Sequence, residues 1–304
     1  MKIRTNRFNS PLWQSAVVVS LLLAVAMPAF PLGLEKVDVI TPSGTDSGLL
    51  SPEALFYDGL RNLLIVANTG AHQVVIMDRR GIATKVSGKG GELRFPTAVA
   101  VTNKGTLFIA ERGKESLRVL PQYESGALEE YHMIELSSYR LAAAVQPSGL
   151  FVTKEGNLYI ADRGNRQVLV FGSDEKFKFK ITGVGEPADI WVGPGKIFVS
   201  DPGFGGIRVY NEEGKAMSTL GTSPAKFRAP LRIRTLAVDR RGRVWAVEEG
   251  NGIRVIDPSD NPLLSISREI TGLFSSIDMT IDDNNNLYIL EQGGNRISVF
   301  RITE

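Results

Sequence analysis

One phrase, repeated along the chain, limits the possible folds more than any other feature of this sequence. Its clearest copy, PSGLFVTKEGNLYIADRGNRQVLVFG, covers residues 147–172. The phrase begins with an apolar strand after Pro147, turns at 154–157, forms a second strand over 158–161 and, after a polar loop, a third over 167–171. Apolar residues that alternate between Gly-rich and Asn-rich breaks are typical of half-buried antiparallel strands.

The spacing of the copies identifies the kind of repeat. A polar residue ends each second strand, and these residues follow one another at intervals of 43, 51, 39, 47 and 43 positions. Intervals of about 40–50 residues are typical of β-propeller blades, and no copy shows helical periodicity. The sequence therefore predicts an all-β fold, a six-bladed β-propeller of four-stranded antiparallel blades, over residues 27–304. The strand-ending residues are Asn68, Glu111, Asp162, Asp201, Glu248 and Glu291.

The last repeat supplies only three strands, which leaves the outer edge of the sixth blade open. An unpaired edge strand is an aggregation hazard. The segment 34–40, LEKVDVI, alternates apolar and polar residues just before the first blade. We expect it to pair with the strand at 297–300 and so close the ring. The 51-residue interval has a separate cause, an insertion over 121–129 that we expect on the outer part of the second blade.

The first 26 residues have the character of a secretory signal peptide. Three basic residues precede the apolar run 16–27, and Ala24-Val25-Ala26 offers a small-residue cleavage site. The run is shorter than the roughly 20 residues that a membrane-spanning helix needs. We therefore expect an exported protein, periplasmic or extracellular. The alternative is an uncleaved membrane anchor over 12–30, the only segment for which we expect membrane contact.

Charge and cysteine content exclude several classes of function. The signal segment holds three of the 35 basic residues and none of the 33 acidic ones, so 32 basic residues remain against 33 acidic ones. A nearly neutral domain lacks the basic footprint of nucleic-acid binding. The chain has no cysteine, which excludes disulfides and thiolate metal sites. Six blades account for nearly all remaining residues, and we expect one domain and a monomer.

The repeat resembles that of the NHL-repeat family over residues 50–303. The third copy matches the family pattern throughout, and the last copy matches most of it, whereas the first, fourth and fifth copies lack its Asn-Arg pair. The resemblance implies the propeller fold but no single function, because the family includes sensor ectodomains, protein-binding and RNA-binding modules and the lyase half of an amidating enzyme. The matching residues are Pro147, Gly156, Tyr159-Ile160-Ala161-Asp162, Asn165-Arg166 and Val170-Phe171, then Asn285, Tyr288-Ile289, Asn295-Arg296 and Val299-Phe300.

The loops after the second strands and the loops that enter the first strands are expected on one face, with charges of both signs. Phe204, between Gly203 and Gly205, cannot be fully buried there and is a candidate anchor for a partner. We predict a non-catalytic, cofactor-free scaffold that presents this face to a protein, peptide or glycan. The residues of the predicted partner face are Arg112, Arg163, Asn165, Arg166, Phe204, Arg228 and Arg296.

The alternative is a metal-dependent hydrolase or lyase, lactonase-like or amidating-lyase-like, at the central channel. Asp162 and Asp201 suit hydrogen bonds from backbone N–H groups of the turns that follow them. Glutamate mimics a turn less well, and a cation such as Ca²⁺ takes six to eight oxygen ligands. The candidate metal ligands are Glu111, Asp189, Glu248, Asp278 and Glu291.

Other enzyme classes find less support in the sequence. Zinc catalysis of the amidating-lyase type needs several histidine ligands, and the chain has only His72 and His132. No serine stands in a nucleophile elbow, and no Gly-rich loop has the spacing and the following helix that phosphate binding requires. The sequence therefore identifies no catalytic residue.

Overall fold

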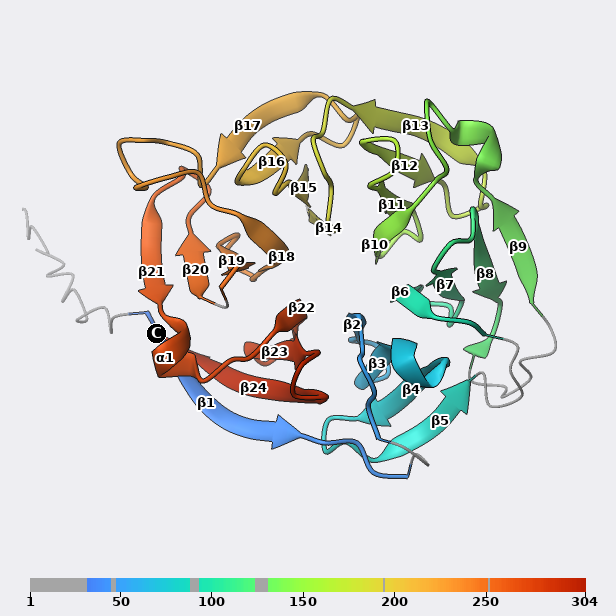
Figure 1. Ribbon diagram of the computed structural model, residues 1–304, viewed down its shortest axis with the longest axis horizontal. Helices are drawn as coiled ribbons and strands as arrows, with labels where there is room; N and C mark the ends of the chain where they lie inside the picture. The colour runs from blue at the N-terminus through green and yellow to red at the C-terminus, as the bar shows by residue number, and fades with distance from the viewer. Residues whose placement is uncertain (1–31, 45–47, 88–92, 124–130, 194, 251) are drawn as a thin grey trace, which may run out of the picture.

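The computed structural model describes residues 32–304 apart from 45–47, 88–92, 124–130, 194 and 251. Six antiparallel four-stranded sheets surround a central axis as the blades of a propeller (Figure 1). This arrangement confirms the predicted fold. The predicted signal peptide lies outside the described residues. Within the part of the chain that the structure describes, no helix has the length and apolar character to cross a membrane.

Each of the first five blades follows the chain from its innermost strand at the axis to its outermost strand at the rim (Figure 1). Blade 1 contains β2 (Ala54–Asp58), β3 (Leu63–Asn68), β4 (Gln73–Asp78) and β5 (Ala83–Ser87), and blade 2 contains β6 (Pro96–Val101), β7 (Leu107–Glu111), β8 (Ser116–Leu120) and β9 (His132–Glu135). Blade 3 contains β10 (Pro147–Val152), β11 (Leu158–Asp162), β12 (Gln167–Phe171) and β13 (Phe177–Thr182).

The remaining strands complete the ring in the same order. Blade 4 contains β14 (Asp189–Gly193), β15 (Lys196–Ser200), β16 (Ile207–Tyr210) and β17 (Ala216–Leu220), and blade 5 contains β18 (Ile233–Val238), β19 (Val244–Glu248), β20 (Ile253–Ile256) and β21 (Pro262–Ile266). Blade 6 contains β22 (Ser276–Ile281), β23 (Asn286–Glu291), β24 (Arg296–Thr303) and the N-terminal β1 (Gly33–Ile40). Short helices lie in connecting loops: η1 (Thr69–Ala71), η3 (Ser137–Tyr139) and α1 (Arg268–Thr271).

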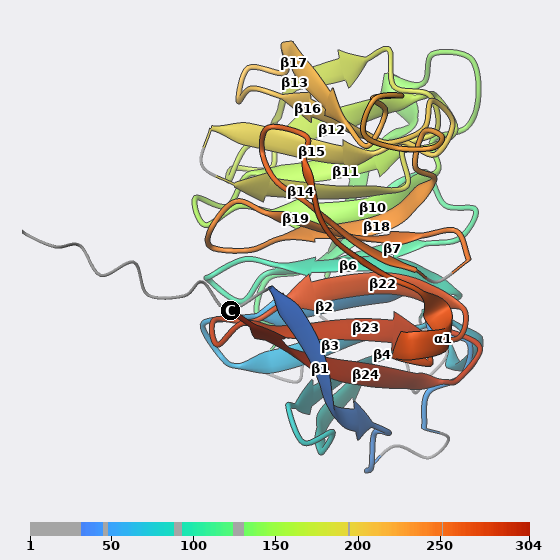
Figure 2. The same ribbon diagram turned by 90° about the vertical axis from the view of Figure 1, so that its left-hand side faces the viewer.

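The N-terminal strand closes the ring, as predicted. β1 pairs antiparallel with β24 from Gly33 opposite Thr303 to Ile40 opposite Ile297, and it lies along the rim of blade 6 (Figures 1 and 2). The pairing is longer than the predicted contact with 297–300. Ile40 is only 3% exposed and belongs to a core cluster shared by blades 6 and 1. The closing strand therefore contributes apolar packing as well as edge hydrogen bonds.

Apolar side chains between neighbouring blades make the frame rigid. The cluster between blades 5 and 6, for example, contains Trp245 and Val247 of β19 together with Leu287 and Ile289 of β23, all four fully buried. Full burial of one such side chain stabilises a fold by about 1.5–3 kcal/mol. The predicted insertion comes between β8 and β9 in the chain, and most of it, in the gap 124–130, lies outside the described residues. The loops are thus held by a packed frame.

Candidate functional site: a carboxyl pair at the inner strands

The loops after the second strands and the loops that enter the blades share one face, which we call the loop face. In five blades a backbone hydrogen bond joins the two loops directly. The donor N–H lies one or two residues after the strand-ending polar residue, and the acceptor is a carbonyl of the entry loop. These bonds run from Gly70 to Leu50, Arg112 to Phe95, Arg163 to Gln146, Glu249 to Arg232 and Gln292 to Ser275. The structure thereby confirms the predicted grouping of the loops.

The strand-ending carboxylates reinforce this junction. Glu291 accepts the N–H of Phe274 through Oε2 at 2.8 Å, and its Oε1 lies 3.0 Å from Nε of Arg296. Burial raises the pKa of Glu291, but hydrogen bonds from Arg296, Ser298 and Phe274 outweigh it and hold that pKa below its usual value. Arginines also face three of the other four strand-ending carboxylates, since Arg118 faces Glu111, Arg208 faces Asp201 and Arg254 faces Glu248, whereas Gln167 faces Asp162.

These contacts leave the predicted glutamate ligands without the geometry of a metal site. Glu111, Glu248 and Glu291 each direct their carboxylate to an arginine of the same blade. Within residues 32–304, omitting the gaps given above, no three His, Asp or Glu side chains lie close enough together to hold a metal ion. We therefore assign Glu111 and Glu291, which accept an N–H of the entry loop, to the junction between loops, and Glu248 to an ion pair with Arg254.

Asp162 and Asp201 accept an N–H of the following turn, as predicted, and also an N–H of the entry loop. Asp162 Oδ1 accepts the N–H of Asn165 in the following turn at 3.3 Å and the N–H of Gln146 in the entry loop at 2.9 Å. Asp201 Oδ2 accepts the N–H of Gly185 at 2.7 Å. The entry loop supplies the shorter bonds, so these aspartates join two loops where a simple turn cap was expected.

The other two predicted ligands, Asp189 and Asp278, come together through a residue that the sequence analysis missed. Thr235 of β18 lies between them, with its Oγ1 atom 2.8 Å from Asp189 Oδ2 and 3.0 Å from Asp278 Oδ1. Backbone N–H groups complete the cluster, because Leu236 donates to Asp189 at 3.0 Å and Leu55 donates to Asp278 at 2.7 Å. We call Asp189, Thr235 and Asp278 the carboxyl–hydroxyl cluster.

The hydrogen count of the cluster favours one proton on the carboxyl pair. A threonine hydroxyl carries one hydrogen and can donate it fully to one carboxylate. The second short contact to Thr235 becomes a hydrogen bond only when that carboxyl group is itself protonated and donates to Oγ1. One ionised and one neutral carboxyl group is therefore the arrangement that satisfies both contacts.

The surroundings of the cluster favour this half-protonated form. Burial raises the pKa of Asp189 to about 6, although the N–H of Leu236 and the hydroxyl of Thr235 oppose the shift. Burial also raises the pKa of Asp278 well above its ordinary value, and the nearby charge of Asp189 raises it further. Like charges so close cannot both ionise readily, so the pair titrates as a unit and holds a proton near neutral pH.

The register of the innermost strands explains why these three side chains meet. In each blade the innermost strand pairs with the second strand, which ends in a polar residue. Asp189, Thr235 and Asp278 lie opposite the residue one position before that end, which is Ser200, Val247 and Leu290 respectively. They therefore occupy one level near the loop face, on blades 4, 5 and 6. The same level on blades 1, 2 and 3 carries Ala54, Ala98 and Gly149. Half of the ring is polar at this level and half has small side chains.

The structure groups only some residues of the predicted partner face in one pocket. Arg112 pairs with Glu53, Arg296 pairs with Glu291, and Arg228 is exposed on the entry loop of blade 5. Asn165 is buried, donates through Nδ2 to Asp162 at 2.9 Å and accepts three N–H groups of the entry loop, so it is a structural residue. The residues that come together are Arg163, Arg166 and Phe204, which line one pocket between blades 3 and 4.

The two Asn-Arg pairs that look alike in the sequence occupy different positions in their blades. In blade 6, Arg296 is the first residue of β24 and lies opposite Glu291. In blade 3 that position belongs to Gln167, opposite Asp162, and Arg166 precedes it in the loop. The repeat is therefore offset by one residue here. As a result, Arg296 neutralises a carboxylate inside its blade while Arg166 extends from the loop.

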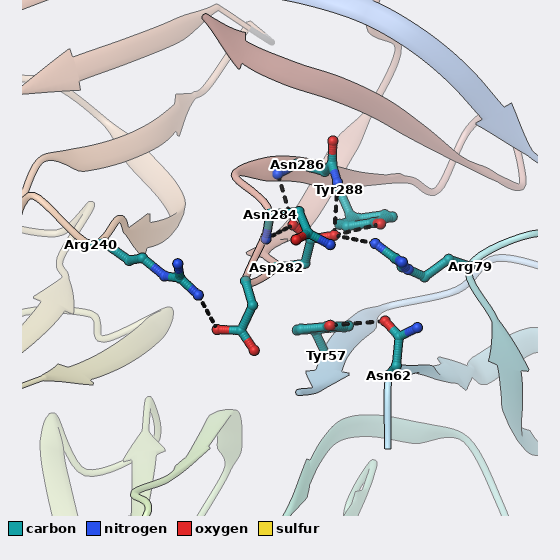
Figure 3. Close-up of polar contacts among 9 residues, drawn as sticks. Tyr57, Asn62, Arg79, Arg240, Asp282, Asn284, Asn286 and Tyr288 are labelled. Atoms are coloured by element: carbon teal, nitrogen blue, oxygen red, sulfur yellow. Dashed lines mark hydrogen bonds and ion pairs between the residues drawn. The ribbon is translucent and has the colours of Figure 1, made fainter. Parts of the chain in front are cut away.

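A second polar network lies at the turns between the first and second strands, on the opposite face. Figure 3 shows Asp282 of blade 6 at its centre, where it accepts the N–H groups of Asn284 at 2.8 Å and Asn286 at 2.9 Å. It also accepts the Tyr288 hydroxyl at 3.0 Å and Arg79 Nη1, from blade 1, at 2.9 Å. Burial alone would raise the pKa of Asp282, but these hydrogen bonds hold it below its usual value. The network caps a turn and joins blades 6 and 1.

Solved structures share this fold at low sequence identity. A gluconolactonase from Xanthomonas campestris is 16% identical, with a TM-score of 0.63 over 91% of this chain and 99% of its own. A streptogramin B lyase is 11% identical, with a TM-score of 0.63 over 90% of this chain and 98% of its own. A virginiamycin B lyase from Staphylococcus aureus, solved with quinupristin, is 13% identical, with a TM-score of 0.62 over 88% and 85%.

These likenesses establish the fold alone. No protein-family model matches the chain, and no curated protein matches it. The resemblance to the NHL-repeat family and the expected export therefore stay predictions. The chain is a six-bladed β-propeller whose structural neighbours include gluconolactonases and virginiamycin B lyases.

Proposed function

We propose that the protein is an acid–base enzyme that opens cyclic esters, with Asp189 and Asp278 as its catalytic pair at the inner strands. The observation that carries this proposal is the pair of short contacts from Thr235 Oγ1 to the two carboxyl groups, at 2.8 and 3.0 Å. These contacts are satisfied when one carboxyl group is ionised and the other neutral. A site in that state can take up one proton and release another in a single reaction.

The chemistry follows from the two protonation states. The ionised carboxylate acts as general base, and the neutral carboxyl group acts as general acid toward the ester oxygen that leaves the ring. If the base activates water, attack on the ester carbonyl gives a hydroxy acid. If the base removes a proton from the carbon next to the C–O bond, elimination gives an alkene and a carboxylic acid. Thr235, only 1% exposed, lies between the two carboxyl groups, and its hydroxyl forms a hydrogen bond with each of them.

A metal ion does not fit this donor set. The cluster offers two carboxylates and one hydroxyl, and the N–H groups of Ile190 and Met279 donate at 2.7 Å to Oδ1 of Asp189 and Oδ1 of Asp278. Backbone N–H groups of Leu55 and Leu236 already occupy the other oxygen of each carboxylate. We therefore assign no step to a metal, and the metal-dependent form of the hydrolase hypothesis is replaced by one that uses the carboxyl pair.

The structural neighbours favour an enzyme over a scaffold. A protein named gluconolactonase acts on a lactone, and proteins named lyases eliminate, which are the two outcomes open to the carboxyl pair. The predicted scaffold function rested on the absence of a catalytic constellation in the sequence. The carboxyl–hydroxyl cluster supplies one, and its raised pKa values are the kind that mark functional sites.

The test is turnover of a small panel of lactones by the wild-type protein, Asp189→Asn and Asp278→Asn. We expect activity that each substitution lowers at least a hundredfold, since general acid–base catalysis contributes roughly 10²–10⁴-fold. Mass spectrometry of the product separates hydrolysis, which adds water, from elimination. The matched control is Asp283→Asn, an exposed aspartate on the opposite face. Full activity in both cluster variants would overturn the proposal.

A further inference from the structure

A pocket on the loop face, between blades 3 and 4, lies outside the carboxyl–hydroxyl cluster. Its volume is about 500 Å³, within the range of small-molecule sites. Arginine and glutamate side chains, an aromatic ring and three glycines form its walls. The lining residues are Arg163, Gly164, Arg166, Gly185, Glu186, Gly203 and Phe204.

Arg166 is held in a conformation that favours other residue types. Its φ is +52°, in the left-handed region, where a branched or long side chain costs about 1–2 kcal/mol relative to glycine. The residues just before the third strands of blades 1, 4 and 6 have the same sign of φ and are His72, Gly206 and Asn295. The positive φ therefore belongs to the turn of the repeat, and blade 3 places an arginine there at a conformational cost. Among the described residues, the Arg166 guanidinium has no hydrogen bond or ion pair.

Arg163 adds a second cation that is only loosely engaged. Its Nε lies 3.7 Å from Glu186 Oε1, and both side chains are about half exposed. An exposed pair at that distance contributes little to stability. Two arginines against one glutamate leave one net positive charge in the pocket, which matches a singly charged anion.

Phe204 supplies an apolar wall with a fixed orientation. Its side chain is 58% exposed, although the Arg208 guanidinium stacks on the ring at 4.1 Å from the centroid. Gly185 permits this placement, because a Cβ there would lie 2.6 Å from Phe204 Cδ2. The ring is thus held beside the two pocket arginines and keeps most of its surface open to a ligand.

We infer that this pocket binds a small organic acid in which one carboxylate lies next to an aromatic ring. Arg166 and Arg163 receive the carboxylate, since a guanidinium donates paired N–H groups to its two oxygens. Phe204 stacks on the aromatic group of the ligand. Glu186 opposes ligands with further negative charge.

The experiment is calorimetric titration of the full chain with N-acetylphenylalanine and with N-acetylphenylalanine amide, which differ only in the carboxylate. We expect the acid to bind at least tenfold more tightly than the amide. Arg166→Asn should lower affinity for the acid at least tenfold without lowering the melting temperature, because asparagine tolerates the left-handed conformation. Arg228→Asn, an exposed arginine of the same face, is the matched control and should bind as the wild type does.

Two further titrations complete the test. In Phe204→Ala, N-acetylphenylalanine and N-acetylglycine should bind equally, whereas the wild type should prefer the aromatic acid. A double variant, Asp189→Asn with Asp278→Asn, should bind the acid as the wild type does, which keeps this test separate from the proposed catalysis. Equal binding of acid and amide, unchanged binding in Arg166→Asn, loss of binding in the double variant, or no saturable binding in the millimolar range would each overturn the inference.

Discussion

Replacing Asp278 by asparagine tests whether the carboxyl–hydroxyl cluster shares a proton. An asparagine can place Nδ2 toward Thr235 Oγ1 and Oδ1 toward the N–H of Leu55, in the positions that a neutral carboxyl group would use, although it loses the bond that Asp278 Oδ1 accepts from the N–H of Met279 at 2.7 Å. Asp278→Asn therefore imitates the protonated cluster, and it removes the possibility of a second charge beside Asp189. The substitution should be tolerated best where the wild-type side chain has to be neutral.

The expected sign follows from the raised pKa values. An unfolded aspartate releases its proton near pH 3.8, while the folded pair keeps a proton to about pH 6 and above. Between these values the folded state binds more protons than the unfolded state, so the free energy of unfolding falls as pH rises. The loss is about 1.4 kcal/mol per pH unit for each retained proton, or about 3 kcal/mol between pH 3.8 and pH 6.

The measurement is urea unfolding of the wild type and Asp278→Asn at several pH values from 4 to 8. The difference in unfolding free energy should shift in favour of the variant by about 1.4 kcal/mol per pH unit wherever the folded wild type keeps a proton that the unfolded chain has released. Comparing the two proteins cancels groups that titrate alike in both. Asp283→Asn, 67% exposed on the opposite face, should show no such trend. A difference that stays constant with pH would refute the shared proton.

Two further predictions concern the frame. Asp282→Asn should lower the free energy of unfolding by about 3 kcal/mol, because it leaves Arg79 and two N–H groups poorly paired, whereas Asp283→Asn should change it by less than about 0.5 kcal/mol; equal effects in urea unfolding would contradict the assigned network. Deleting residues 33–40 should lower the melting temperature and cause concentration-dependent self-association, and Ile40→Ala alone should cost about 2–4 kcal/mol. Scanning calorimetry with light scattering checks both, and a deletion variant that stays monomeric with an unchanged melting temperature would show that the ring does not depend on β1.

The fold could be predicted because the repeat encodes it six times. Each copy carries its own strands and turns, so an error in one copy does not change the number of blades. The closing strand followed from a physical requirement, since the last repeat lacked a fourth strand and an open edge is unfavourable. The segment 34–40 was the one alternating segment ahead of blade 1, and the structure pairs it with β24.

The candidate site was predictable only in part, because its contacts cross between blades. Asp189 and Asp278 stood out as acids early in first strands, but a lone threonine in a strand is ordinary, and Thr235 gave no signal. Both β18 and β22 shift register by one residue just before the site, whereas β14 does not, so counting along the strands misaligns the three residues. Counting from the partner strand aligns them.

Glutamate at the end of a second strand has a structural role that the sequence did not predict. Glu111, Glu248 and Glu291 were considered possible metal ligands because glutamate caps its own turn poorly. In the structure the longer side chain reaches the neighbouring entry loop and an arginine of the third strand, at 2.8 Å from the N–H of Arg94 in blade 2 and of Phe274 in blade 6. The glutamate side chain thus bonds to a neighbouring loop, a contact that the sequence alone does not show.

At the level of the cluster, blades 4, 5 and 6 carry polar side chains, whereas blades 1, 2 and 3 carry alanine or glycine. This difference explains how a repeated structure can hold a single site. Six equivalent positions lie at the same level, and carboxylates on adjacent blades would repel each other. Asp189 and Asp278 stand two blades apart, so the hydroxyl of Thr235 fits between them. On blade 3 a Cβ at Gly149 would lie 3.0 Å from the Cα of Asp189, which leaves no room for a polar side chain there. Close packing on one side and hydrogen bonding on the other therefore confine the chemistry to blades 4, 5 and 6.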